Sequence, residues 1–220
     1  VFNSRTGINN TNVFSVADDI TKSADPANGT IQKLYAEDTN LTIFQELKVS
    51  RALIDKDAIY SAEGNAAITS SNLTIGVIQP YQGKYGISKN PESFAVYGYN
   101  KYFSDRNNNV IMRLSKSGLD EISRFGMVDY FRDQLNNNRL GKIIGGWDIH
   151  NDQYVVNLQD DKGGKGENLS FDESVKGWTS FFDYNPDQMF SIRNNFYSIT
   201  NESLYRHYST SVNRGNFYGV

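Results

Sequence analysis

Few residues of this sequence could bind a metal ion through sulfur or nitrogen. The chain has no cysteine and two histidines, His150 and His207, which lie in different segments. A zinc site would need both histidines together with distant carboxylates, because protein zinc sites take three or four Cys, His or carboxylate ligands. We therefore interpret His150 as a solvent-facing residue of a hairpin turn and His207 as a packing or hydrogen-bonding residue of a strand. We predict no metal ligand.

A second candidate is a calcium loop that begins at residues 105–109 (DRNNN), where oxygen-bearing side chains fall on alternate residues. A calcium loop of this kind carries glycine at its sixth position and a bidentate glutamate at its twelfth. Val110 and Lys116 occupy these two positions. The pattern therefore favours a hairpin turn.

The other candidates for chemistry are glycine-rich or acidic. Residues 163–166 (GGKG) lack the spacing of a phosphate-binding loop and the Ser or Thr after its lysine, and no serine lies in a Gly-x-Ser-x-Gly elbow. The acidic pairs, Asp160 with Asp161 and Asp172 with Glu173, fall in predicted loops, where solvated turns are the simpler interpretation. Two acids could still meet in space, as they do in glycan-cleaving enzymes. We predict that the protein is not an enzyme, with no catalytic or cofactor-binding residue and no cofactor.

Charge and hydropathy argue against two kinds of partner. The 220 residues carry a net charge of −3, which is too weak to indicate nucleic-acid binding. No apolar run approaches the roughly 20 residues that a membrane-spanning helix needs. We therefore predict no nucleic-acid specificity and no membrane span.

These residues must be positioned by a mainly β fold, because short apolar and aromatic stretches alternate with Asn, Asp and Gly turns. We expect an extended N-terminal segment at residues 1–30 and a β-rich domain at residues 31–220, as part of a longer chain. At most one or two short helices are expected, and the best candidate is residues 128–135, where apolar residues have helical spacing.

Within the β-rich domain, residues 31–60 predict short strands with a turn at 55–57, although a helix through 46–54 is an alternative. Residues 80–90 and 160–168 are predicted loops. Further strands are expected at residues 73–78, 94–104, 110–114, 143–149 and 153–158.

The stretch 171–208 predicts a meander of at least three strands with turns at 184–187, 194–195 and 201–202. Segments 94–114, 144–158 and 189–208 share one form, an apolar strand, an Asn/Asp turn and a return strand. Their starts are about 45 to 50 residues apart, close to the repeat of a propeller blade. The fold is therefore expected to be propeller-like, with an irregular β-sandwich as the alternative.

Several sequence runs resemble large virion structural proteins of tailed bacteriophages, found in marine phages and in crAss-like phages of gut bacteria. The most distinctive is GISKNPESFAVYG, within residues 85–102. The resemblance implies a component of the tail or of its distal end, of the nozzle, muzzle or baseplate kind, and it brings no catalytic motif. The other runs are residues 3–9 (NSRTGIN), 31–44 (IQKLYAEDTNLTIF), 52–64 (ALIDKDAIYSAEG), 144–158 (IGGWDIHNDQYVVNL) and 175–208.

We therefore expect a virion subunit that is assembled in the host cytoplasm and acts by contact. Its partners would be other copies of itself in a symmetric ring or tube and neighbouring tail proteins. The alternative is a receptor- or glycan-binding module at the virion surface, for which Trp147 and Trp178 are the residues to inspect as parts of an exposed groove. A tail-associated hydrolase is a third possibility and would require two carboxylates in one cleft.

Overall fold

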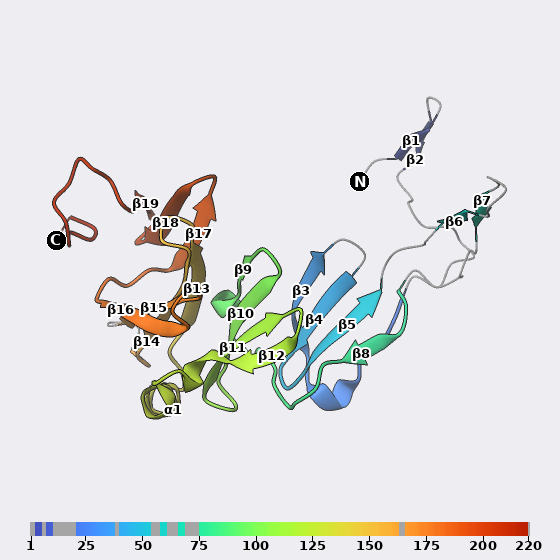
Figure 1. Ribbon diagram of the computed structural model, residues 1–220, viewed down its shortest axis with the longest axis horizontal. Coiled ribbons are helices and arrows are strands. Elements are labelled where there is room, and N and C mark those ends of the chain that lie inside the picture. Colours follow the sequence, from blue (N-terminus) through green and yellow to red (C-terminus); the bar gives the residue numbers. More distant parts are fainter. Residues whose placement is uncertain are drawn as a thin grey trace.

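The computed structural model describes residues 3–5, 8–10, 21–37, 40–53, 58–60, 66–68, 75–162 and 166–219. In this part of the chain the fold is mainly β, and every strand pairing is antiparallel (Figure 1). The predicted fold class is confirmed, as is the helix predicted at 128–135, which is the single α-helix of the described residues. The helical elements are α1 (Val128–Asn137) and the 3₁₀ helices η1 (Pro26–Asn28), η2 (Pro91–Ser93) and η3 (Ile122–Arg124).

Four sheets, each made of three or four strands, account for most of the described chain. The first has the order β3-β4-β5-β8, and the hairpin β6–β7 is inserted between β5 and β8. A further hairpin, β1–β2, precedes the first sheet. The bounds are β1 (Asn3–Arg5), β2 (Ile8–Asn10), β3 (Ile31–Glu37), β4 (Asn40–Gln45), β5 (Val49–Leu53), β6 (Ala58–Tyr60), β7 (Ala66–Ile68) and β8 (Ile78–Pro80).

The other three sheets are simple meanders of consecutive strands. The second sheet contains β9 (Ala95–Tyr97), β10 (Asn100–Asp105), β11 (Val110–Ser115) and β12 (Gly118–Glu121). The third contains β13 (Ile143–Asp148), β14 (Gln153–Gln159), β15 (Gly166–Asp172) and β16 (Gly177–Phe182). The fourth contains β17 (Gln188–Ile192), β18 (Asn195–Thr200) and β19 (Ser203–Arg206).

Turn chemistry explains why the meanders form. Thr200 pairs with Ser203, so the β18–β19 turn has two central residues, Asn201 and Glu202. Both have positive φ, 49° and 60°. A two-residue turn of this conformation follows the right-handed twist of its strands, and Asn tolerates the left-handed region better than most residues. The predicted turn at 201–202 is therefore confirmed.

The four sheets pack face against face in chain order (Figure 1). Alternation along β10 shows how: Phe103 lies in the core shared with the first sheet, and its neighbour Tyr102 lies in the core shared with the third. In the third sheet, Tyr154 and Val156 face the second sheet, whereas Val155 faces the fourth. The two middle sheets are thus apolar on both faces, since successive side chains of a strand point to opposite sides.

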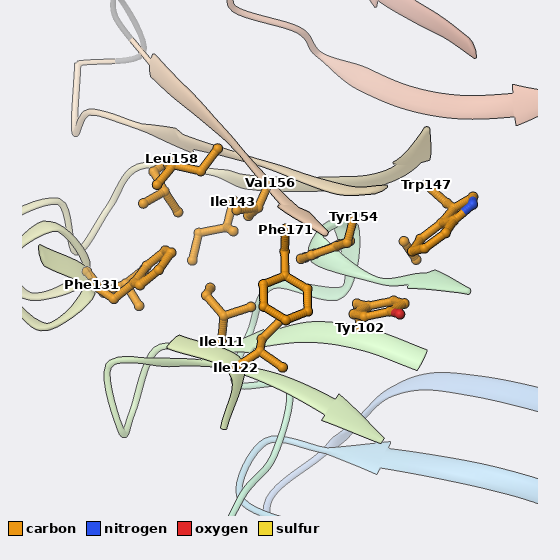
Figure 2. Packing of buried hydrophobic residues seen from close by; sticks show 13 residues of the cluster. Tyr102, Ile111, Ile122, Phe131, Ile143, Trp147, Tyr154, Val156, Leu158 and Phe171 are labelled. Carbon is orange, nitrogen blue, oxygen red and sulfur yellow. The ribbon is translucent and has the colours of Figure 1, made fainter. Parts of the chain in front are cut away.

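The largest of the three cores lies between the second and third sheets, and α1 closes one end of it (Figure 2). Phe131 of α1 is fully buried there with Phe171 of β15. At the other end, the rings of Tyr102 and Trp147 stack with centroids 5.4 Å apart. This core fixes the second and third sheets against each other.

The propeller expectation is not met in the described residues, whose sheets pack like those of a sandwich and do not close into a ring. The segments 94–114, 144–158 and 189–208 do lie in three different sheets. The meander predicted at 171–208, however, is divided between two sheets. β15 and β16 complete the third sheet, and the loop at 183–187 carries the chain to the fourth.

Three local expectations are wrong. The helix alternative for 46–54 fails because Val49–Leu53 is β5. A strand was expected at 73–78, but residues 75–77 are not in a strand and β8 starts only at Ile78. In this segment Gly76 lies against the Leu53 carbonyl. The loop predicted at 160–168 ends before Gly166, because residues 166–168 pair with β14. The turn expected at 55–57 lies outside the described residues, and the boundary predicted at residue 30 stays a prediction.

Candidate functional site

The rings of both histidines contact Tyr208. His150 follows β13, and its ring stacks on Tyr208 with centroids 4.3 Å apart. His207 follows β19, and its Nε2 lies 2.7 Å from the Ser198 hydroxyl. Burial lowers the pKa of His207. Among the described residues, no group of three or more His, Asp or Glu side chains could hold a metal ion.

A serine that contacts a histidine could be an activated nucleophile, but Ser198 is not available for this role. Its side chain is fully buried. Its oxygen also accepts a hydrogen bond from the Tyr218 hydroxyl at 2.9 Å. The Ser198–His207 contact therefore ties β18 to the chain that follows β19, and a substrate could not reach it.

The segment 105–109 is a hairpin turn between β10 and β11, as predicted. Asp105 is 1% exposed, and its carboxylate accepts hydrogen bonds from the Gly86 amide at 3.1 Å and the Ser88 hydroxyl at 3.1 Å. It also accepts from the backbone and side chain of Asn108. Burial raises the pKa of Asp105. Its carboxylate connects the second sheet to the loop after β8 and is occupied by protein donors.

The other acidic candidates are likewise engaged in structural contacts. Asp161 accepts hydrogen bonds from the backbone amides of Leu140 and Gly141, at 2.7 and 3.0 Å. Asp172 accepts from the backbone and hydroxyl of Ser174 at 2.7 and 2.6 Å. Residues 163–165 lie outside the described part of the chain.

The Glu173 carboxylate joins two sheets. It accepts hydrogen bonds from the Tyr102 hydroxyl and from the Arg113 guanidinium, each at 2.5 Å, and Arg113 also pairs with Asp120 at 2.8 Å. Tyr102, Arg113 and Asp120 belong to the second sheet, and Glu173 lies in the β15–β16 turn of the third. This network joins the rims of the two sheets and is a structural feature.

Trp147 and Trp178, which were expected to line an exposed groove, instead pack in or against the largest core. Trp147 is 6% exposed and is stacked between Tyr97 and Tyr102, with ring centroids 4.4 and 5.4 Å away. Trp178 packs on Phe131 and donates its indole N–H to the Ile122 carbonyl at 3.0 Å. The two tryptophans hold the second and third sheets together.

An aromatic pocket instead lies beside the fourth sheet. Its volume is about 650 Å³, and it is lined by Phe182 and by the stretches 205–209 and 212–219. We call it the 205–219 pocket. Phe217 stacks on the buried Tyr184 with centroids 4.7 Å apart, and Tyr218 packs on Tyr205 at 4.6 Å. These contacts hold the 207–219 segment over the edge of the sheet (Figure 1).

The second candidate surface is the face of the fourth sheet turned away from the third, which we call the outer face. Met189 and Phe196 point inward to the shared core, so the residues that alternate with them point outward. Ile192 is 56% exposed and Leu204 is 61% exposed. The apolar residues of the outer face are Phe190, Ile192, Tyr197, Ile199 and Leu204.

The sequence patterns did not single out either surface. Met189, Phe190 and Ile192 give an apolar strand with apolar residues on both faces, so the pattern does not show which face meets another sheet. Tyr205, Tyr208, Phe217 and Tyr218 are aromatic residues in a chain that contains 14 tyrosines and 13 phenylalanines. Many aromatic residues of this chain pack in its cores, so the sequence does not distinguish the aromatic residues that line the pocket.

Comparison with known protein families identifies the chain. The family model described as the Crassvirus muzzle protein matches residues 18–202. The protein is a member of the Crassvirus muzzle family. A comparison with curated proteins gave no significant match.

As a Crassvirus muzzle family member, the chain is a structural protein of a bacteriophage virion. The resemblance to phage virion structural proteins is thereby confirmed. Of the nozzle, muzzle and baseplate that it implied, the family name supports the muzzle. The matched residues cover the first three of the four larger sheets and the fourth sheet as far as the turn between β18 and β19. No described helix is long and apolar enough to span a membrane.

Proposed function

We propose that this muzzle-family protein is a tail subunit that assembles with copies of itself into a symmetric oligomer and contacts neighbouring tail proteins. It acts by contact, without catalysing a reaction, after assembly in the host cytoplasm. The family match supports the virion role. The outer face of the fourth sheet is the observation that supports self-assembly.

The outer face has the character of an interaction surface. In the three internal packings, one apolar sheet face covers another. The outer face presents the same kind of residues, and no sheet of the described residues covers it. Phe190 and Tyr197 lie ring beside ring, with centroids 5.9 Å apart. Ile192 and Leu204 are already partly buried, so covering the rest of each side chain would contribute about 1–2 kcal/mol. A cluster of exposed apolar residues commonly marks a protein interface.

Light scattering of the purified chain, with negative-stain images, tests the assembly. We expect a mass several times that of one chain, and rings or tubes in the images. Leu204→Asp and Ile192→Lys should reduce the mass towards that of one chain, because each places a charge in the centre of the interface. A compact monomer at all concentrations would contradict the proposal.

Val128→Asp is the matched control for these variants. The exposed fraction of Val128, 52%, is similar to that of Ile192. Val128 lies at the start of α1, on another part of the surface. An acidic residue in the first turn of a helix is favourable, so folding should be preserved. Equal loss of assembly in Val128→Asp would show that added charge alone disrupts the oligomer.

Receptor or glycan binding at the virion surface is the second candidate function. The tryptophans that would have favoured it pack in or against the largest core, but the 205–219 pocket is a separate observation in its favour. Its volume lies within the range of small-molecule sites.

A further inference from the structure

The 205–219 pocket combines aromatic rings with cationic groups and has no described acidic lining residue. Arg206 is the last residue of β19, and Arg214 lies in the segment that covers the pocket. Within the described residues, neither guanidinium makes an ion pair or a hydrogen bond to a carboxylate. The lining is therefore positively charged at neutral pH in a protein whose net charge is −3.

The aromatic rings form an apolar wall of the pocket, and other side chains pack against two of these rings. Phe217 packs on Tyr184, which is 6% exposed, and Tyr208 stacks on His150. The Tyr208 hydroxyl is fixed by a hydrogen bond to the buried carboxylate of Asp148. Rings that are fixed by contacts on one side lose little entropy when a ligand covers the other side.

This chemistry defines the ligand. A guanidinium binds a carboxylate through two parallel hydrogen bonds, and an aromatic face buries the C–H face of a sugar ring. We propose that the 205–219 pocket binds an acidic saccharide, with the carboxylate at Arg206 or Arg214 and the ring against the aromatic wall. All lining residues except Phe182 come from one short stretch. Because β19 is the edge strand of the fourth sheet, an acidic peptide is the rival ligand, and the test below includes one.

The inference deepens the glycan-binding candidate and rests on it. Arg206 pairs with Tyr197 of the outer face, so light scattering accompanies each binding measurement. Its test is a ligand-observed NMR titration of the whole chain with glucuronic acid, and with glucose as the uncharged control. We expect glucuronic acid to bind with a Kd of about 1 mM or below and glucose to bind at least about ten-fold more weakly. Binding should weaken as salt is raised, because exposed charges are screened.

Arg206→Ala and Arg214→Ala test the contribution of each guanidinium. At least one of them should weaken glucuronic acid binding about ten-fold. Both residues are exposed, so neither change threatens the fold. Lys142→Ala removes one exposed positive charge just before β13, outside the pocket, and should bind like the unchanged protein.

Three results would overturn the proposal: no binding of glucuronic acid, equal binding of glucose, or unchanged affinity in both arginine variants. Displacement of the sugar by a hexaglutamate peptide at lower concentration would assign the pocket to an acidic peptide instead. Light scattering of the same samples separates the two proposals. An intact oligomer that fails to bind sugar overturns this site alone, and a monomer that binds sugar overturns self-assembly alone.

Discussion

The Tyr154 hydroxyl donates a hydrogen bond to the Ser93 carbonyl oxygen at 2.8 Å, and both residues are fully buried. Tyr154 is in β14 and Ser93 ends η2, 61 positions earlier in the chain. This bond joins the third sheet to the turn that starts the second.

Tyr154→Phe should lower the free energy of unfolding by about 1–3 kcal/mol, because the Ser93 carbonyl loses a donor in a site that water does not reach. Urea denaturation measures the loss. Tyr99→Phe is the control, since Tyr99 is 57% exposed and its ring contact with Lys116 does not need the hydroxyl. Equal effects of the two changes would contradict the role given to the Tyr154 bond.

Gly145→Ala should lower the stability of the protein more than the addition of a single methyl group suggests. A Cβ at Gly145 would lie 2.0 Å from the Ser93 carbonyl oxygen, which is backbone and cannot rotate away. We expect a loss of about 1–3 kcal/mol or more, as for other overpacked sites. Gly177→Ala is the matched control in the same sheet, because its Cβ would have no neighbour closer than 3.8 Å. Thermal unfolding of the two variants compares them directly, and a stable Gly145→Ala protein would argue against this close approach.

Glu173→Ala should destabilise the junction of the second and third sheets. It removes the acceptor of the Tyr102 hydroxyl and one partner of Arg113, whose side chain is 18% exposed. We expect a loss of about 1–3 kcal/mol. Asp129→Ala breaks the exposed ion pair with Arg132 and should cost less than about 1 kcal/mol. If the two losses were the same, Glu173 would be no more than a surface charge.

Stability should fall in mild acid because of His207. Burial lowers its folded-state pKa below the usual 6.5, so the unfolded chain takes up a proton before the folded protein does. The unfolded state then binds more protons, and the free energy of unfolding decreases as pH falls through 6.5 towards the folded pKa.

Urea denaturation at pH 7 and pH 5 measures this dependence. His207→Gln should flatten it, because glutamine does not titrate and can still reach the Ser198 hydroxyl. An unchanged slope in His207→Gln would assign the acid sensitivity to other groups.

The sequence predicted the middle of the fold well, because the signals there are local. The hairpin β13–β14 has two apolar runs around an Asn/Asp turn, and α1 has apolar residues at helical spacing. β15 was missed at its start because Gly166, Glu167 and Asn168 have poor strand propensity. Pairing with β14 makes this segment a strand, and tertiary context of this kind outweighs propensity.

The division of 171–208 between two sheets could not be predicted for a related reason. Residues 184–187 (YNPD) have the composition of a hairpin turn. Here they connect two sheets: the Tyr184 carbonyl accepts a hydrogen bond from Asn168 and the Pro186 carbonyl accepts one from Gln159. The same residue types serve hairpins and connections between sheets, so only the distant partners distinguish them. The pocket was missed because its rings resemble those of the core.

The order of the sheets also bears on how the protein is made. Each meander uses consecutive strands, and each of the three cores joins sheets that are neighbours in the chain. The hairpin contacts within each meander have short sequence separations, which favours their early formation, whereas the Tyr154–Ser93 contact between sheets spans 61 positions. As the chain leaves the ribosome, each completed sheet can dock on the one before it. Until the next sheet emerges, every intermediate presents one bare apolar face, and aggregation of the nascent chain would begin there.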